Sequence, residues 1–153
     1  MRLLHAAGGA GKTRLGLQWA RERPNHGGQS AAGFIAGALT PENVATLAAA
    51  HADLVLDYAE SRPHLADLLR ALATRAQQKI PGHLRLLLLA RGDGDWWSNL
   101  TAADDAIGAL LADGPAPLAL PPVPPEDRAA QFHHAGACFQ RLRGWPAPPT
   151  APT

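Results

Sequence analysis

The chain has 153 residues, of which 46% are hydrophobic, and its 14 Lys and Arg residues almost balance its 13 Asp and Glu residues. Such a chain is long and apolar enough for one globular domain with a core. The balanced charge indicates no nucleic-acid partner. No apolar run reaches the ~20 residues of a membrane-spanning helix, and a single cysteine excludes an internal disulfide. We therefore expect a soluble, cytoplasmic protein.

The first half of the chain alternates short apolar runs with helical patterns. A strand ending at Leu3–His5 is followed at once by glycines and by a helix that opens at Gly11-Lys12-Thr13. A second strand is expected at Gly33–Ala36. The next helix begins at Thr40-Pro41-Glu42, where threonine is a good N-cap and proline suits the first helical position.

The second part of this alternation is clearer. Asp53–Asp57 is a short apolar run that closes on a carboxylate, and a helix with one leucine-rich face is expected to start at Ser61. Leu84–Ala90 is almost continuously apolar, as a parallel strand buried on both faces should be. The order predicts a three-layer α/β fold with a mostly parallel sheet. We assign residues 1–114 to this core.

The C-terminal part has weaker signals. A short helix around Ile107–Leu111 is stopped by Gly114-Pro115, and Leu118–Leu120 fits an edge strand between prolines. A further helix is predicted from Glu126 to Arg143. We assign residues 115–144 to the same domain as the core, and residues 145–153 to a proline-rich flexible tail.

The glycine-rich segment after the first strand matches the P-loop pattern G-x-x-x-x-G-K-[ST], except that Ala6 stands at its first glycine. Glycines let backbone N–H groups approach phosphate oxygens, and the positive end of a helix lies behind them. Lys12 is expected to reach the β- and γ-phosphates, and Thr13 to coordinate Mg²⁺. The alternative is a glycine-rich turn before a helix that starts with Lys-Thr by chance. The predicted nucleotide-binding residues are Gly8, Gly9, Ala10, Gly11, Lys12, Thr13 and Arg14.

Three further residues follow buried strands and are candidates for the same site. Asp57 could anchor the Mg²⁺ water shell or merely cap a turn. Glu60 could orient an attacking water or be a plain surface acid, since Tyr58 stands directly after Asp57, where many hydrolases of this type have a glutamate. Arg91 could read the γ-phosphate or be a solvated arginine at the end of a strand.

At these residues the chain resembles the signal-transduction ATPases with numerous domains (the STAND class). The resemblance rests on LLHAAGGAGKTRL at Leu3–Leu15, DLVLDYAESRP at Asp53–Pro63 and LLLLARGDGDWW at Leu86–Trp97. It implies an ATP-binding core of the additional-strand type, in which the Arg91 strand lies between the first strand and the Asp57 strand. It also implies a regulatory switch with slow ATP hydrolysis. Relatives carry segments before and after this core, so we expect a shortened core.

The leading hypothesis is therefore a Mg²⁺- and ATP-binding switch domain, with Glu60 and Arg91 in catalytic roles and Thr13 and Asp57 at the metal. Its partners would be the nucleotide and other proteins or domains. The main alternative is a binding-only or inactive fragment that serves as an interaction module. A small-molecule kinase using the same loop is less favoured, because neither an arginine-rich lid nor an acceptor pocket is evident.

Overall fold

The computed structural model describes residues 1–22, 31–80 and 83–143. The chain divides into two compact units, Met1–Pro121 and Pro122–Thr153. The composition of residues 25–30 predicts a loop, and Pro81-Gly82 is expected to end the helix before it. Both segments, and the proline-rich tail predicted at 145–153, lie outside the described residues.

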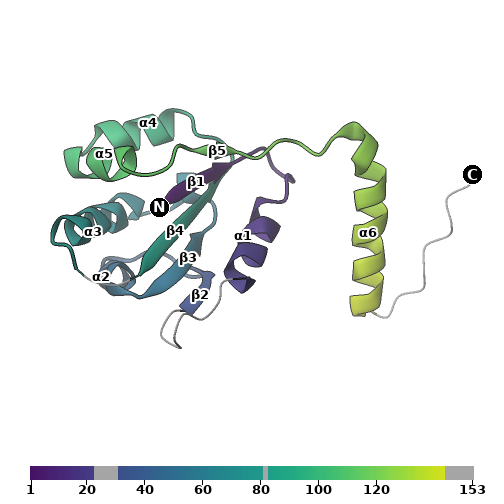
Figure 1. Cartoon of the computed structure of the whole chain (residues 1–153), viewed down its shortest axis with the longest axis horizontal. Coiled ribbons are helices and arrows are strands. Elements are labelled where there is room, and N and C mark those ends of the chain that lie inside the picture. Colours follow the sequence, from purple (N-terminus) through teal and green to yellow (C-terminus); the bar gives the residue numbers. More distant parts are fainter. Residues whose placement is uncertain (23–30, 81–82, 144–153) are drawn as a thin grey trace, which may run out of the picture. The chain divides into compact units, whose positions relative to one another are not determined.

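The first unit is built on a five-stranded parallel sheet, which confirms the predicted α/β class (Figure 1). The strand order is β2-β3-β4-β1-β5. The strand that leads to Arg91, β4, thus lies between β1 and β3, in the position that the resemblance implied. The strands are β1 (Arg2–His5), β2 (Ala31–Phe34), β3 (Ala52–Leu56), β4 (Leu84–Ala90) and β5 (Leu118–Ala119).

Helices flank both faces of this sheet (Figure 1). They are α1 (Lys12–Arg21), α2 (Pro41–Ala49), α3 (Leu65–Gln77), α4 (Asp95–Ala102) and α5 (Asp105–Ala112). Neighbouring strand residues point to opposite faces. Leu3, Leu56 and Leu88 therefore join the larger core under α2, α3 and α5, to which α4 adds its two tryptophans. Leu4, Val55 and Leu89 face the other way and pack with residues of α1.

Local capping signals account for the starts of α2 and α5. Thr40 caps α2 in a reciprocal capping box with Asn43, and Pro41 is the first helical residue, as predicted. Asp104 caps α5 by accepting from the N–H groups of Ala106 and Ile107. A hydrogen bond from Arg70 lowers the pKa of Asp104, and the bonds from those N–H groups lower it further.

Three sequence-based boundaries were wrong. The helix α3 begins at Leu65 and not at Ser61, because a 3₁₀ turn at Ala59–Ser61 comes first and His64 is left-handed. Strand β2 starts two residues before the expected Gly33. The turn-like sequence Asp93-Gly94-Asp95 predicts Asp95 as the cap of a short helix, whereas Asp95 is the first residue of α4 and Gly94 is its N-cap.

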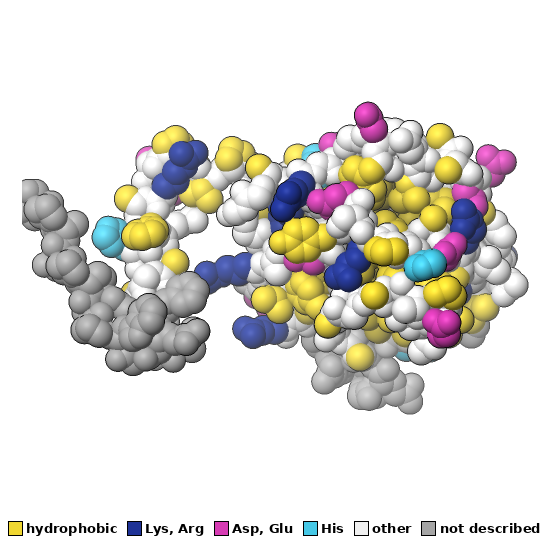
Figure 2. Space-filling model, turned by 180° about the vertical axis from the view of Figure 1, so that it is seen from behind, with side chains coloured by type: hydrophobic (Ala, Val, Ile, Leu, Met, Phe, Trp, Pro, Cys, Tyr) yellow, Lys and Arg dark blue, Asp and Glu magenta, His cyan; other side chains and the backbone are white. Residues whose placement is uncertain are grey.

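The second unit contains the helix α6 (Pro125–Arg143), one residue longer than predicted. The short β5 belongs to the sheet of the first unit, as its edge strand. That α6 forms one domain with the sheet stays a prediction, because α6 belongs to the second compact unit. None of the helices in the described parts is both long and apolar enough to cross a membrane. On the face drawn in Figure 2, charged side chains of both signs are interspersed over the first unit, with hydrophobic side chains between them.

Gly16 sets how closely α1 can approach the sheet. A Cβ atom at this position would lie 3.1 Å from Cζ of Phe34 and 3.2 Å from side-chain atoms of Leu89 and Val55. Val55 and Leu89 are fully buried, so neither side chain has room to move away. The absence of a side chain at Gly16 therefore brings the helix that follows the glycine loop against β2, β3 and β4.

We expect Gly16→Ala to lower the free energy of unfolding. Overpacking of this kind costs roughly 1–3 kcal/mol, which outweighs the ~1 kcal/mol that alanine gains over glycine in a helix. Thermal or urea unfolding measures the difference. Gly136→Ala in α6 is the control, since a Cβ there meets nothing within 4 Å and should be neutral or slightly stabilising. A Gly16→Ala variant as stable as the parent would contradict this account.

Candidate functional site

The carboxyl ends of β1, β3 and β4 come together at one edge of the sheet. His5, the last residue of β1, pairs with Ala90, the last residue of β4, so that the loops after both strands start side by side. The helix after β1 lies on one face of the sheet, whereas those after β3 and β4 lie on the other. In open parallel sheets, ligands bind at such a switch point, outside the carboxyl ends of the strands.

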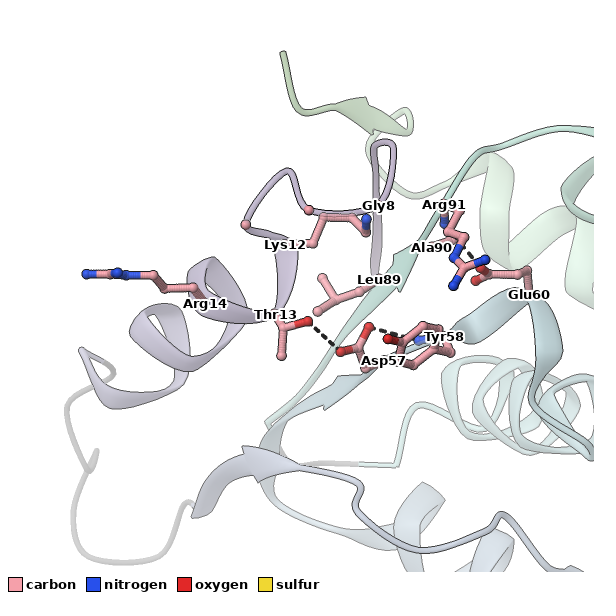
Figure 3. Close-up of a pocket in the computed structure, with 12 residues that line it drawn as sticks. Gly8, Lys12, Thr13, Arg14, Asp57, Tyr58, Glu60, Leu89, Ala90 and Arg91 are labelled. Atoms are coloured by element: carbon pink, nitrogen blue, oxygen red, sulfur yellow. Dashed lines mark hydrogen bonds between the residues drawn. The ribbon is translucent and has the colours of Figure 1, made fainter. Parts of the chain in front are cut away.

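A pocket of about 390 Å³ lies at this edge, and Figure 3 shows the residues around it. Every residue that the sequence analysis assigned to the site lines this pocket, with the exception of Ala10. Three residues that it did not assign complete the lining, Tyr58, Leu89 and Ala90. The full set is Gly8, Gly9, Gly11, Lys12, Thr13, Arg14, Asp57, Tyr58, Glu60, Leu89, Ala90 and Arg91.

The loop between β1 and α1 needs glycine at two positions. Gly9 and Gly11 have φ angles of 79° and 88°, in the left-handed region that residues with a Cβ rarely adopt. Ala6, which replaces a glycine of the P-loop pattern, has no such angle, and its N–H donates to the carbonyl of Ala90. Alanine at this position therefore imposes no backbone strain on the loop.

Lys12 folds its side chain back over the loop. Its Nζ donates to the carbonyl oxygens of Ala6, at 2.7 Å, and of Ala7, at 3.0 Å. As the first residue of α1, Lys12 also lies where a helix presents N–H groups without intrahelical acceptors. A lysine ammonium and the positive end of a helix thus lie together at the pocket, an arrangement that favours anions.

Thr13 and Asp57 join the two sides of the pocket. The Oγ1 of Thr13 donates to Oδ2 of Asp57 at 2.7 Å, although the residues are 44 positions apart in the chain. The other carboxylate oxygen of Asp57 accepts from the backbone N–H of Tyr58 at 2.9 Å. Asp57 therefore stabilises the turn after β3, which was the structural alternative to a metal role. It also lies beside Thr13, the threonine predicted to bind a metal.

Glu60 lies on the short 3₁₀ turn that follows Asp57. Its Oε1 accepts the backbone N–H of Arg91 at 3.2 Å, which ties this turn to the end of β4. Among the described residues, its Oε2 is buried and has no hydrogen-bond partner. An unpaired buried acceptor is costly, so natural proteins rarely keep one without a reason. This oxygen makes Glu60 a candidate for binding or activating a water.

Arginines take two different positions around the pocket. The guanidinium of Arg91 stands over the ring of Tyr58, with Cζ 5.8 Å from the ring centroid. Arg14 contributes to the lining too, but its side chain extends along α1 away from Lys12 and Arg91 (Figure 3). Arg91 is therefore better placed than Arg14 to meet a ligand held by the glycine loop.

Arg62 was missed as a supporting residue. Its guanidinium donates to the main-chain carbonyls of Asp57 and Gly37, both at 3.0 Å, and more weakly to that of Ile35, at 3.5 Å. It thereby holds the segments that follow β2 and β3 together and fixes the backbone of Asp57. The sequence carries no signal for this, because all its acceptors are backbone carbonyls, which any residue provides.

A magnesium ion could be held here by few protein atoms. The described residues contain no group of three or more His, Cys, Asp or Glu side chains that could hold a metal by itself. Magnesium, however, is commonly bound through one or two protein ligands together with waters and phosphate oxygens. The Thr13 hydroxyl and the Asp57 carboxylate fit that mode, with the phosphates supplying the remaining charge.

Comparisons of the chain with protein-family models, with curated proteins and with solved structures found no match.

We expect Arg62→Ala to lower the free energy of unfolding by roughly 1–3 kcal/mol, because the bonds from a charged donor to partly buried carbonyls are lost. Arg62→Lys is the matched control, since lysine keeps the charge but cannot reach several acceptors with one rigid fork. It should recover only part of the loss in a urea titration. Equal stability of Arg62→Ala and the parent would remove Arg62 from this supporting role.

Proposed function

We propose that the first unit is a Mg²⁺-dependent ATP-binding domain of the P-loop type, and that it acts as a regulatory switch with slow hydrolysis. The observation that carries this proposal is the 2.7 Å hydrogen bond between Thr13 and Asp57. A metal-phosphate site needs a hydroxyl at the start of the helix after the glycine loop and a carboxylate at the end of a neighbouring strand. Here these groups, distant in sequence, meet at one pocket.

The roles of the lining residues follow from their charges and positions. The loop amides and the ammonium of Lys12 would bind the phosphates, and Thr13 and Asp57 would hold Mg²⁺. The ion would neutralise charge on the phosphate oxygens. Among the described residues, Lys12 bonds to two carbonyl oxygens of its own loop, so a phosphate would replace weak neutral acceptors with a charged one.

Hydrolysis would depend on Glu60. Glu60 lines the pocket, and its buried Oε2, which has no hydrogen-bond partner among the described residues, would accept a proton from water. The second candidate function is nucleotide binding without turnover, as an interaction module. It is favoured by the bond from Arg91 N–H to Glu60 Oε1, which gives this carboxylate a structural role as well.

The strand order supports the proposed class. The order β2-β3-β4-β1-β5 puts one extra strand between the strand before the glycine loop and the strand before Asp57. This is the arrangement that the resemblance to the STAND class implied, and it would place the unit in a larger signalling protein or beside protein partners. The proposal of a switch rests on that resemblance, whereas the proposal of nucleotide binding rests on the pocket.

Lys12→Ala should weaken Mg·ATP binding roughly 10- to 100-fold, because a charge-assisted contact to phosphate is removed. Isothermal titration calorimetry on parent and variant measures this. Lys79→Ala, which removes the same charge away from the pocket, is the control and should bind like the parent. Equal ATP affinity in Lys12→Ala and the parent would reject the assignment of this loop as a phosphate-binding loop.

ATP at 100 times its Kd should add about 2.7 kcal/mol to the free energy of unfolding of the parent.

Asp57 and Glu60 should separate binding from turnover. Asp57→Asn should reduce the Mg²⁺-dependent part of the affinity, because a neutral amide cannot balance the charge of the ion. Glu60→Gln should keep most of the affinity and lower phosphate release roughly 100-fold or more, the usual contribution of a general base. Phosphate release by Glu60→Gln at the parental rate would exclude Glu60 as the base. A parent that binds ATP and releases no phosphate would establish the binding-only function.

A further inference from the structure

Tyr58, which lines the pocket, has an unusual backbone conformation and an exposed ring. It follows the metal-binding candidate Asp57 directly, its φ angle is 56°, and its side chain is 53% exposed. An aromatic residue in the left-handed region is strained, and strain of this kind concentrates at functional sites. The core does not account for this ring, since an exposed tyrosine contributes little to packing.

The ring contacts Arg91, which also lines the pocket. The Cζ of Arg91 lies 5.8 Å from the ring centroid, within the range of a cation–π interaction. The backbone of Arg91 is fixed independently, since its N–H donates to Glu60. Both ends of Arg91 are therefore held by residues of one short segment, Tyr58 to Glu60.

The charge of Arg91 is free for a ligand. Within the described residues, Arg91 forms no salt bridge, although the carboxylates of Asp57 and Glu60 line the same pocket. Asp57 already accepts from Thr13 and Tyr58 N–H, and Glu60 accepts the backbone of Arg91 and not its side chain. An aromatic ring orients a guanidinium without neutralising it, which keeps the positive charge available to a phosphate.

The position of this charge decides which phosphate it meets. Figure 3 shows Lys12 and Arg91 on opposite sides of the pocket, with Thr13 and Asp57 below them. A ligand that starts on the glycine loop must extend across the pocket before it reaches Arg91. The group farthest along such a chain of phosphates is the terminal phosphate of a triphosphate, which a diphosphate lacks.

We propose that Tyr58 is a specificity-determining residue of this site, whose ring positions Arg91 to read the terminal phosphate and thereby favours a nucleoside triphosphate over a diphosphate. This inference rests on the proposed nucleotide-binding function. Tyr58 acts through Arg91 and is a positioning residue. A tyrosine directly after Asp57 would then serve to distinguish the triphosphate from the diphosphate in a site whose turnover is slow.

The test compares Mg·ATP with Mg·ADP affinity by calorimetry in the whole chain. Tyr58→Asn removes the ring with little added backbone strain, because asparagine tolerates the left-handed region better than most residues. It should reduce the ratio of ATP to ADP affinity by about two- to fivefold, the value of an exposed cation–π contact. Tyr58→Phe keeps the ring and should retain the parental ratio. Circular dichroism and the melting temperature check that each variant is folded.

A double-mutant cycle separates positioning from a structural effect. In an Arg91→Gln background, which itself should lose much of the ATP preference, Tyr58→Asn should change the ratio no further. An unchanged ratio in Tyr58→Asn, or an equal loss with and without Arg91, overturns the inference while leaving nucleotide binding in place. A parent that binds neither ATP nor ADP overturns the proposed function and this inference together.

Discussion

The pairing of β4 with strands on both of its sides is the constraint on which the rest of the structure depends. Leu88 of β4 pairs with Leu3 of β1 and with Leu56 of β3, so one register aligns three strands. It brings the ends of β1 and β4 level and ends β3 two residues lower. Along the strand direction, Asp57 therefore lies two residues before the level of Arg91, beside Thr13 at the start of α1. That difference in level lets a hydroxyl on α1 reach the carboxylate.

Core packing and the pocket are built from the ends of the same strands, and Leu89 contributes to both. Val55 and Leu89 pack against α1 where Gly16 lets the helix come close, and each stands two residues before a residue of the pocket, Asp57 or Arg91. A shift of α1 away from the sheet would therefore move Thr13 relative to Asp57. The stability of this face and the geometry of the proposed phosphate site are therefore coupled, because α1 contributes to both.

The chemistry of the pocket comes from a mixture of paired and unpaired groups. The carboxylate of Asp57 accepts hydrogen bonds from the Thr13 hydroxyl and from the N–H of Tyr58, and Arg62 donates to the main-chain carbonyl of Asp57. Lys12 rests on neutral carbonyls, Arg91 rests on a ring, and one oxygen of Glu60 has no partner among the described residues. The groups that shape the site are thus firmly bonded. The groups proposed to meet phosphate or water keep their capacity for stronger interactions, as a binding site requires.

Patterns local in the chain were sufficient to predict the α/β class, the five strands and most helices. The glycine loop with Lys12 and Thr13, and Asp57 at the end of a strand, were also identified in this way. Periodicity, capping residues and glycine spacing act over a few residues, so they can be read without the fold. The late start of α3 could not be predicted from such local patterns, because it depends on the left-handed His64 and the turn before it. Only the tertiary structure decided that Thr13 meets Asp57, that Arg62 clamps backbone carbonyls and that Arg91 stands over Tyr58. Each of these contacts joins segments set by strand register and helix approach, and their partners include groups that every residue carries.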